Sequence, residues 1–242
     1  MGILKQCLST GLISMIKTTG EVERYIITVG LCLVTMIISY LLGSLSSAII
    51  VSKALYKEDI RTHGSGNAGL TNMLRTYGKG AAALTLVGDM LKTAVAILIT
   101  AIVFGFSYSG GISISGFCYL SGLCAVFGHV YPVFYGFKGG KGVLVTATMA
   151  LILTPLVFIS LLTLFIIIVA ISGYVSLGSI CVASLFPVAV CLNSYFLGGS
   201  VPVLTAVCTL VLGIFVVWCH RTNIGRLRAG TEKKISIGKK EK

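Results

Sequence analysis

Apolar runs long enough to cross a lipid bilayer recur along this 242-residue chain, from residue 25 to residue 219. A membrane-spanning helix needs about 20 predominantly apolar residues, because each residue adds about 1.5 Å along the helix axis. Hydrophobic residues make up 56% of the chain and the mean hydropathy is +1.00, values that soluble globular domains do not reach. The sequence therefore predicts an all-α polytopic integral membrane protein.

Seven membrane-spanning helices are expected within a single domain over residues 25–220. Residues 1–24 contain polar and charged residues throughout and are expected to form an N-terminal extension, either an interfacial helix or an over-long start, while residues 221–242 form a basic tail. Thr154-Pro155 predicts a turn, since a helix usually stops before the residue that precedes proline. The expected spans are 25–50, 80–104, 113–130, 141–154, 156–172, 177–193 and 201–219.

The formal charge of +12 is concentrated in clusters beside the apolar runs. Basic clusters in that position mark the cytoplasmic loops of membrane proteins and can lie against anionic lipid head groups, so a nucleic-acid partner is not expected. The links near 105–112, 154–155 and 194–200 carry no charge, whereas those near 53–79 and 137–141 and the tail are basic. This alternation predicts an external N-terminus and a cytoplasmic C-terminus.

The chain shows no pattern that calls for a metal or a cofactor. None of its eight cysteines lies in a CxxC pair, and most are embedded in apolar runs, where they are expected to pack as small apolar residues. No group of His, Cys and carboxylate side chains has the spacing of metal ligands.

Four polar, glycine-rich segments interrupt the apolar pattern, all on the predicted cytoplasmic face. They are "HGSGNAGLTNMLR", "FKGGKG", "YVSLGS" and "HRTNIGRLRAGTE". Short re-entrant or interfacial loops of this kind can meet in one site. Helix ends facing such a site leave backbone N–H groups unpaired, which suits an anion.

The first segment formally matches the dinucleotide fingerprint G-x-G-x-x-G, but it follows a membrane span and lacks the strand of a βαβ unit. A phosphate cradle is the better interpretation, because glycines let backbone N–H groups approach an anion closely and Arg75 adds a planar fork of donors. The alternative is a flexible turn between helices. The candidate phosphate-binding residues are Gly64, Ser65, Gly66, Asn67, Gly69, Thr71, Asn72 and Arg75.

The second segment, "KGGKG", resembles half of a P-loop but lacks its first glycine and its Ser or Thr, which disfavours an NTPase. Gly139 and Gly140, ahead of Lys141, could still place an ammonium and helix-terminal N–H groups on a phosphate. The alternative is a lysine that snorkels to the membrane surface.

In the last segment His220 and Asn223 are spaced i, i+3 and so share a helix face. The histidine could act on a substrate or simply cap helix carbonyls. Asp89 and Lys92, also spaced i, i+3, are expected to neutralise each other inside the second span.

Taken together, these segments resemble the bacterial acyl-phosphate:glycerol-3-phosphate acyltransferase family over roughly residues 36–234. The blocks that carry the resemblance keep their order and spacing, although the family usually has proline where Ser46 stands. The matching blocks are "YLLGSLSSA", "DIRTHGSGNAGLTNMLRTYGK", "DMLK", "GHVYPVFYGFKGGKG", "YVSLGSI" and "HRTNIGRLRAGTEKK".

The resemblance implies a seven-helix enzyme of the bacterial cytoplasmic membrane. Its members transfer a fatty acyl group from acyl phosphate to the 1-hydroxyl of glycerol 3-phosphate, giving lysophosphatidic acid and phosphate in phospholipid synthesis. The enzyme that supplies acyl phosphate is a candidate partner. Carried over to this sequence, the catalytic and substrate-binding positions are Ser65, Arg75, Lys141, Ser176, His220 and Asn223.

Two alternatives concern the reaction and the class of protein. Either His220 is the general base, or a phosphate oxygen of the substrate takes the proton while His220 and Asn223 hold the substrate; the resemblance favours the second. A transporter of phosphate or a phosphate ester is the rival function. Transporters place ionisable groups near the bilayer midplane between repeated halves, whereas this chain shows no internal repeat.

Overall fold

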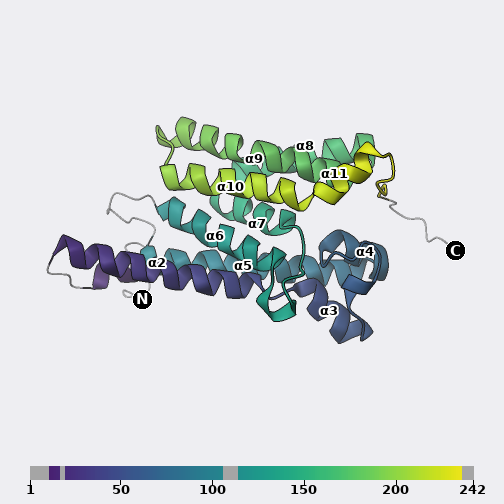
Figure 1. The fold of residues 1–242 in the computed structure, drawn as a ribbon. Helices are drawn as coiled ribbons and strands as arrows, with labels where there is room; N and C mark the ends of the chain where they lie inside the picture. Colours follow the sequence, from purple (N-terminus) through teal and green to yellow (C-terminus); the bar gives the residue numbers. More distant parts are fainter. Residues whose placement is uncertain (1–10, 17–19, 106–113, 236–242) are drawn as a thin grey trace.

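The computed structural model describes residues 11–16, 20–105 and 114–235, and in these ranges the chain forms helices and no strand (Figure 1). Three short 3₁₀ turns, η1 (Leu12–Met15), η2 (Ile60–Thr62) and η3 (Val133–Tyr135), accompany the α-helices. The α-helices are α2 (Glu21–Gly43), α3 (Ser47–Tyr56), α4 (Leu70–Tyr77), α5 (Lys79–Phe104), α6 (Ile114–Val130), α7 (Val143–Leu153), α8 (Pro155–Ser172), α9 (Val175–Gly198), α10 (Val203–Cys219) and α11 (Arg221–Arg228).

The expected all-helical membrane fold is confirmed, but the count of seven spans is not. Among the described residues five helical stretches are long and apolar enough to cross a bilayer, or six if α10 and α11, bent by 52°, are one span. The stretch expected as the fourth span is α7, whose 11 residues reach only about 16 Å. The turn at Thr154-Pro155 is confirmed, because α7 ends at Leu153 and α8 begins at Pro155.

The expected first span, 25–50, is interrupted. Helix α2 ends at Gly43 and α3 begins at Ser47, and the break falls on the small and polar residues "GSLSS" at 43–47. The break frees the carbonyl of Leu45, which accepts a hydrogen bond of 2.8 Å from Lys92 Nζ. A backbone carbonyl without a helical partner inside an apolar region needs another donor, and Lys92 of α5 provides it.

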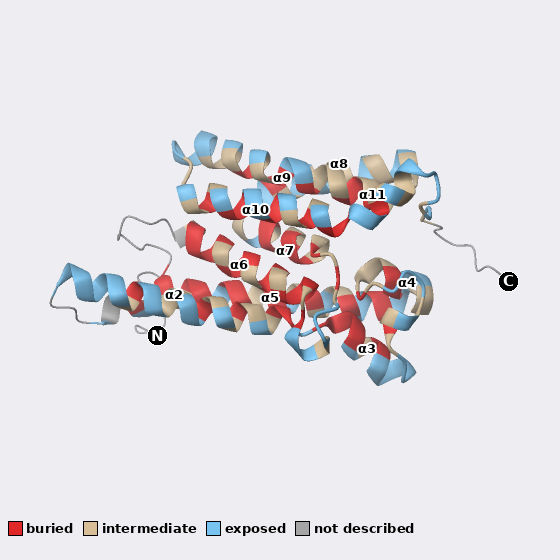
Figure 2. Ribbon diagram, viewed as in Figure 1, coloured by how far each residue is buried: buried red, intermediate tan, exposed pale blue. Residues whose placement is uncertain are grey.

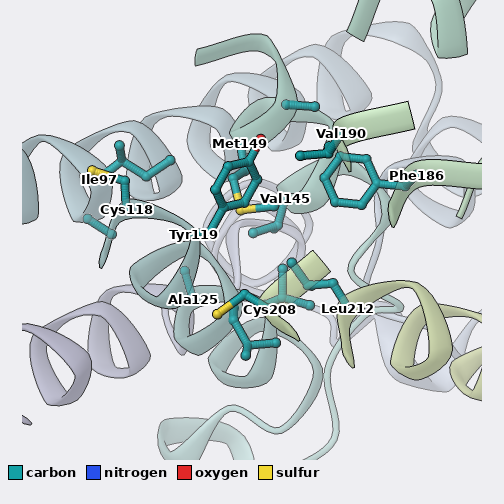
Figure 3. Close-up of a cluster of buried hydrophobic side chains, with 14 of the residues drawn as sticks. Ile97, Cys118, Tyr119, Ala125, Val145, Met149, Phe186, Val190, Cys208 and Leu212 are labelled. Atoms are coloured by element: carbon teal, nitrogen blue, oxygen red, sulfur yellow. The ribbon is translucent and has the colours of Figure 1, made fainter. Parts of the chain in front are cut away.

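The helices pack in layers, with α6 and α7 between α2 and α5 on one side and α8, α9 and α10 on the other (Figure 1). Buried residues concentrate on the inward faces, whereas the outer faces of α2, α8 and α9 expose apolar side chains to the lipid (Figure 2). The core gathers around Tyr119 of α6 and Met149 of α7 (Figure 3). The Tyr119 hydroxyl shares a hydrogen bond of 3.1 Å with Thr154, which satisfies its one polar atom.

Small residues let α2 and α6 approach closely. A Cβ on Gly128 would collide with the carbonyl oxygen of Tyr40, and one on Gly43 would collide with the backbone of Ala125. Beside this contact the hydroxyls of Ser39 and Ser121 are hydrogen-bonded at 2.8 Å. Lipid offers no hydrophobic drive for helix association, so backbone approach and such bonds hold the pair together.

We expect Gly128→Ala to destabilise the protein by about 1–3 kcal/mol, because the added methyl group forces α6 away from α2. The measurement is thermal unfolding in detergent micelles. Gly30→Ala is the matched control, since a Cβ on Gly30 of α2 meets no atom within 4 Å. Equal melting temperatures for the two variants would contradict the close contact.

The polar connections lie at one end of the bundle, where Figure 1 places α3, α4 and α11. Arg61 ties two of them together: its Nη1 donates to the carbonyl of Tyr135 at 2.6 Å, and its Nη2 lies 2.8 Å from Asp59 Oδ2. The hydrogen bond from Arg61 lowers the pKa of Asp59 to about 2. The carboxylate therefore stays ionised and keeps Arg61 in place.

Candidate active site

The glycine-rich loop 64–69 is folded around Asn72 of α4. The Asn72 Oδ1 accepts from the backbone N–H of Ser65 at 3.0 Å, and its Nδ2 donates to the carbonyls of His63 and Asn67 at 3.0 and 3.1 Å. Gly64 has φ of +61°, and a Cβ there would collide with Asn72 Oδ1. The buried Asn72 thus shapes the loop, and its polar atoms are engaged within it.

Arg75 and Ser65 are both solvent-exposed residues at the edge of a cavity. Neither side chain makes a hydrogen bond or ion pair in the described ranges, and both border the same cavity. An arginine left in this way next to a cavity is a ready site for an anion.

Lys141 lies between Gly140 and α7 and borders the same cavity. Its Nζ donates to Asn223 Oδ1 at the start of α11, a contact across 82 positions of sequence. Burial and the positive charge of Arg226 lower the pKa of Lys141 to about 8. The ammonium is therefore desolvated and placed among other cations, an arrangement that an anionic ligand would relieve.

Three of the predicted phosphate-binding glycines do not border the cavity: Gly66, Gly139 and Gly140. The N–H groups of Gly139 and Gly140 donate to the carbonyls of Val130 and His129, each at 3.1 Å, so they are not free for a ligand. These two glycines instead allow the loop to lie directly against His129.

A carboxylate that the sequence analysis did not select joins Ser176 to Asn223. Glu232 Oε1 accepts from Ser176 Oγ and from Asn223 Nδ2, each at 2.7 Å, and Oε2 accepts from Arg226 Nε at 2.6 Å. Burial raises the pKa of Glu232, but the hydrogen bonds from Ser176, Arg226 and Asn223 outweigh it and lower the pKa overall.

His220 stands at the junction of α10 and α11 and is buried. Its Nδ1 lies 2.7 Å from the carbonyl of Val216. A carbonyl only accepts, so Nδ1 carries the hydrogen and Nε2 of the neutral ring is left as an acceptor.

Apart from Gly66, Gly139 and Gly140, the predicted site residues border one cavity of about 700 Å³, and so does Glu232. Of the predicted residues it brings together Gly64, Ser65, Asn67, Gly69, Thr71, Asn72, Arg75, Lys141, Ser176, His220 and Asn223. At its other end the wall is apolar, with Leu151 of α7, Phe158 and Leu162 of α8, and Phe186 of α9. A cationic end continues into an apolar one, which suits a ligand with an anionic head and a hydrocarbon chain.

Five charged or titratable residues on the cavity wall are not among the site residues predicted from the sequence. Asp89 was expected only as an ion-pair partner of Lys92, and that pair is confirmed at 2.8 Å. For Glu232 the available sign in the sequence is its isolation, since no other acidic residue occurs between Asp89 and Glu241. The five residues are Asp89, His129, Arg226, Glu232 and Lys233.

Fold and cavity together define an integral membrane protein with one cavity that is cationic at one end and apolar at the other. The sequence model of the glycerol-3-phosphate acyltransferase family matches residues 33–230, and the chain belongs to this family. It is therefore a membrane enzyme of phospholipid synthesis that transfers an acyl group to glycerol 3-phosphate, as the sequence resemblance predicted, and not a transporter.

Relatives and solved structures agree with this assignment. The glycerol-3-phosphate acyltransferase of Clostridioides difficile is 40% identical over 84% of this chain and 95% of its own length. That of Syntrophomonas wolfei is 43% identical over 83% and 95%. The crystal structure of PlsY, an integral membrane glycerol 3-phosphate acyltransferase, in its glycerol 3-phosphate form is 35% identical with a TM-score of 0.72, over 85% of this chain and 96% of PlsY. The lysophosphatidic acid form gives 34% and 0.70.

Proposed function

We propose that the acyl donor is acyl phosphate and that the 1-hydroxyl of glycerol 3-phosphate receives the acyl group, giving lysophosphatidic acid and phosphate. The observation that carries the proposal is the continuity of the cavity, from Arg75 and Lys141 at one end to Leu162 and Phe186 at the other. Both substrates bear phosphate groups, and the solved PlsY structures are glycerol 3-phosphate and lysophosphatidic acid forms.

In the proposed reaction the 1-hydroxyl oxygen attacks the carbonyl carbon of the mixed anhydride, the C–O bond to phosphate breaks, and the hydroxyl proton passes to a phosphate oxygen of a substrate. Phosphate is a good leaving group, so the protein mainly positions two anions and stabilises the developing oxyanion. We assign Arg75 and Lys141 to the phosphates, and Ser65, Ser176 and Asn223 to hydrogen bonds with the substrates.

Nε2 of His220 is an acceptor at the cavity wall and can hold the substrate hydroxyl. We propose that a substrate phosphate oxygen takes the proton. His220→Gln should then lower kcat by only about tenfold, whereas loss of a general base typically costs 10²–10⁴-fold. The measurement is initial rate against pH for both proteins. A drop of about 1,000-fold with loss of the acidic limb of the profile would identify His220 as the base.

We further propose that the enzyme lies in the bacterial cytoplasmic membrane, with the cavity facing the cytoplasm and the N-terminus outside. The basic connections support this orientation, since α4, which carries Arg75, and the basic helix α11 lie at the same end of the bundle (Figure 1). A single cysteine introduced at an exposed site, Lys138→Cys, in a cysteine-free background should be labelled only when a membrane-impermeant thiol reagent reaches the cytoplasmic face.

The donor is tested with purified protein in lipid nanodiscs, given glycerol 3-phosphate and either palmitoyl phosphate or palmitoyl-CoA. We expect lysophosphatidic acid and one equivalent of phosphate from palmitoyl phosphate alone. Product from palmitoyl-CoA but not from palmitoyl phosphate would refute the proposed donor.

Binding of glycerol 3-phosphate should weaken as the pH rises past about 8. The pKa of Lys141 is lowered to about 8, so the side chain is charged below that pH and neutral above it, and a dianion needs the charge. The affinity for glycerol 3-phosphate, measured by isothermal titration calorimetry, should fall by roughly tenfold or more between pH 7.5 and pH 9.5. Lys141→Arg, which keeps its charge, should flatten this dependence; a wild-type affinity that stays level to pH 9.5 would contradict the role of Lys141.

A further inference from the structure

A buried polar cluster lies under the cavity and has no part in the reaction described above. It consists of Asp89 and Lys92 on α5 and His129 at the end of α6, with exposed fractions of 1%, 5% and 4%. Asp89 and His129 border the cavity. Ionisable groups inside a membrane protein are costly to bury, so such a cluster points to a function.

The contacts of Lys92 fix where His129 carries its hydrogen. Lys92 Nζ donates to the Leu45 carbonyl at 2.8 Å and lies 2.8 Å from Asp89 Oδ1, an ion pair that favours the ammonium form. The same Nζ lies 3.1 Å from His129 Nδ1. Asp89 Oδ1 also faces Nδ1, but at 3.7 Å it lies beyond hydrogen-bond distance. The nearer ammonium has no acceptor, so Nδ1 accepts from Lys92, and the hydrogen of the neutral imidazole sits on Nε2.

The Nε2 edge of His129 is directed at the meeting point of the two glycine-rich loops. A Cβ on Gly140 would collide with Nε2 and would lie 2.9 Å from the carbonyl oxygen of Ala68. In the described part of the chain Nε2 makes no hydrogen bond, although the ring borders the cavity. An N–H group that has no protein partner and belongs to a residue on the cavity wall is available to donate to a ligand.

We propose that His129 is a substrate-binding residue whose Nε2–H donates to a phosphate oxygen of an anionic substrate, and that Asp89 and Lys92 are positioning residues that set its tautomer. The two buried histidines then complement each other: His220 offers an acceptor and His129 a donor. The proposal rests on the proposed function only in taking this cavity as the substrate site.

The tautomer can be observed directly by ¹⁵N NMR of histidine-labelled protein in nanodiscs. The sequence contains three histidines, which single His→Gln variants assign. Between pH 6 and pH 8 we expect His129 to stay neutral with its hydrogen on Nε2, opposite to the Nδ1–H form of His220. Adding sn-glycerol 3-phosphate should shift the His129 Nε2 signal, and adding glycerol should not. An Nδ1–H form, an imidazolium, or no shift with saturating glycerol 3-phosphate would overturn the proposal.

Kinetics provide the second measurement. His129→Leu should lower kcat/KM roughly 10- to 100-fold, the cost of losing a hydrogen bond to a charged group, while His129→Gln, which keeps an N–H donor, should recover most of it. Thr100→Val is the control, because this buried hydroxyl of α5 bonds only to its own helix. Equal losses in the Leu and Gln variants with unchanged melting temperatures would refute donation by Nε2. If the Leu variant does not fold, the NMR measurement on the wild type decides, and neither result depends on which acyl donor is used in the cell.

Discussion

Arg75→Ala and Lys141→Ala should each lower kcat/KM by roughly 100-fold or more while leaving the protein folded. Each substitution removes one charge-assisted contact to phosphate, which is worth about 3 kcal/mol. Arg75 has no partner among the described residues, and Lys141 has only the Asn223 side chain, so neither substitution leaves a buried carboxylate unpaired. The measurement is the initial rate with palmitoyl phosphate at varied glycerol 3-phosphate.

Two other cations provide matched controls for charge alone. Lys138 is exposed and stands three residues before Lys141, and Arg221 is exposed with its guanidinium 4.2 Å from the centre of the Trp218 ring. Neither borders the cavity. Lys138→Ala and Arg221→Ala should therefore retain most activity. Losses as large as those at Arg75 and Lys141 would indicate a general effect of net charge and would remove the argument for a cationic pocket.

The sequence predicted the membrane fold and most of the residues that border the cavity, because both depend on local patterns. Apolar runs indicate helices in a bilayer, and the alternation of glycine with small polar residues indicates the loop 64–69. Neither pattern depends on contacts with distant parts of the chain. The break between α2 and α3 was missed for the opposite reason. No proline or charged residue marks the break in the sequence. The Leu45 carbonyl that it leaves without a helical partner is hydrogen-bonded by Lys92, which is 47 positions away.

The same limit explains the residues of the site that were not selected. His129 lies at the end of an apolar span, where spacing gives no sign that Lys92 faces one of its nitrogens and Gly140 the other. Gly139 and Gly140 were read as phosphate ligands from their resemblance to a P-loop. In the fold their N–H groups donate to the carbonyls of Val130 and His129. These positions require glycine because the loop lies directly against His129 and leaves no room for a Cβ.

Glu232→Ala should lower kcat/KM by roughly 100-fold, a loss comparable to that at Lys141, although Glu232 is not expected to touch the reacting atoms. Its carboxylate is the common acceptor for Ser176, Asn223 and Arg226. Without it the Ser176 hydroxyl and the Asn223 amide lose their fixed orientation, and Asn223 in turn positions Lys141. The buried donors left unpaired should also destabilise the fold by about 1–3 kcal/mol, measured by thermal unfolding. Glu58→Ala is the control, because Glu58 is half exposed and bonds to Tyr77 at the surface.

A double variant separates the two ways in which Glu232 could act. If its role is to neutralise Arg226, then Arg226→Gln should restore most of the activity that Glu232→Gln removes, because the unpaired cation is gone. If its role is to orient Ser176 and Asn223, the double variant should stay inactive, since both donors still lack a carboxylate. We expect the second result, because two of the three hydrogen bonds to Glu232 come from residues placed at the substrate and only one comes from Arg226. Full recovery in the double variant would show that the carboxylate balances charge and does not hold the site in shape.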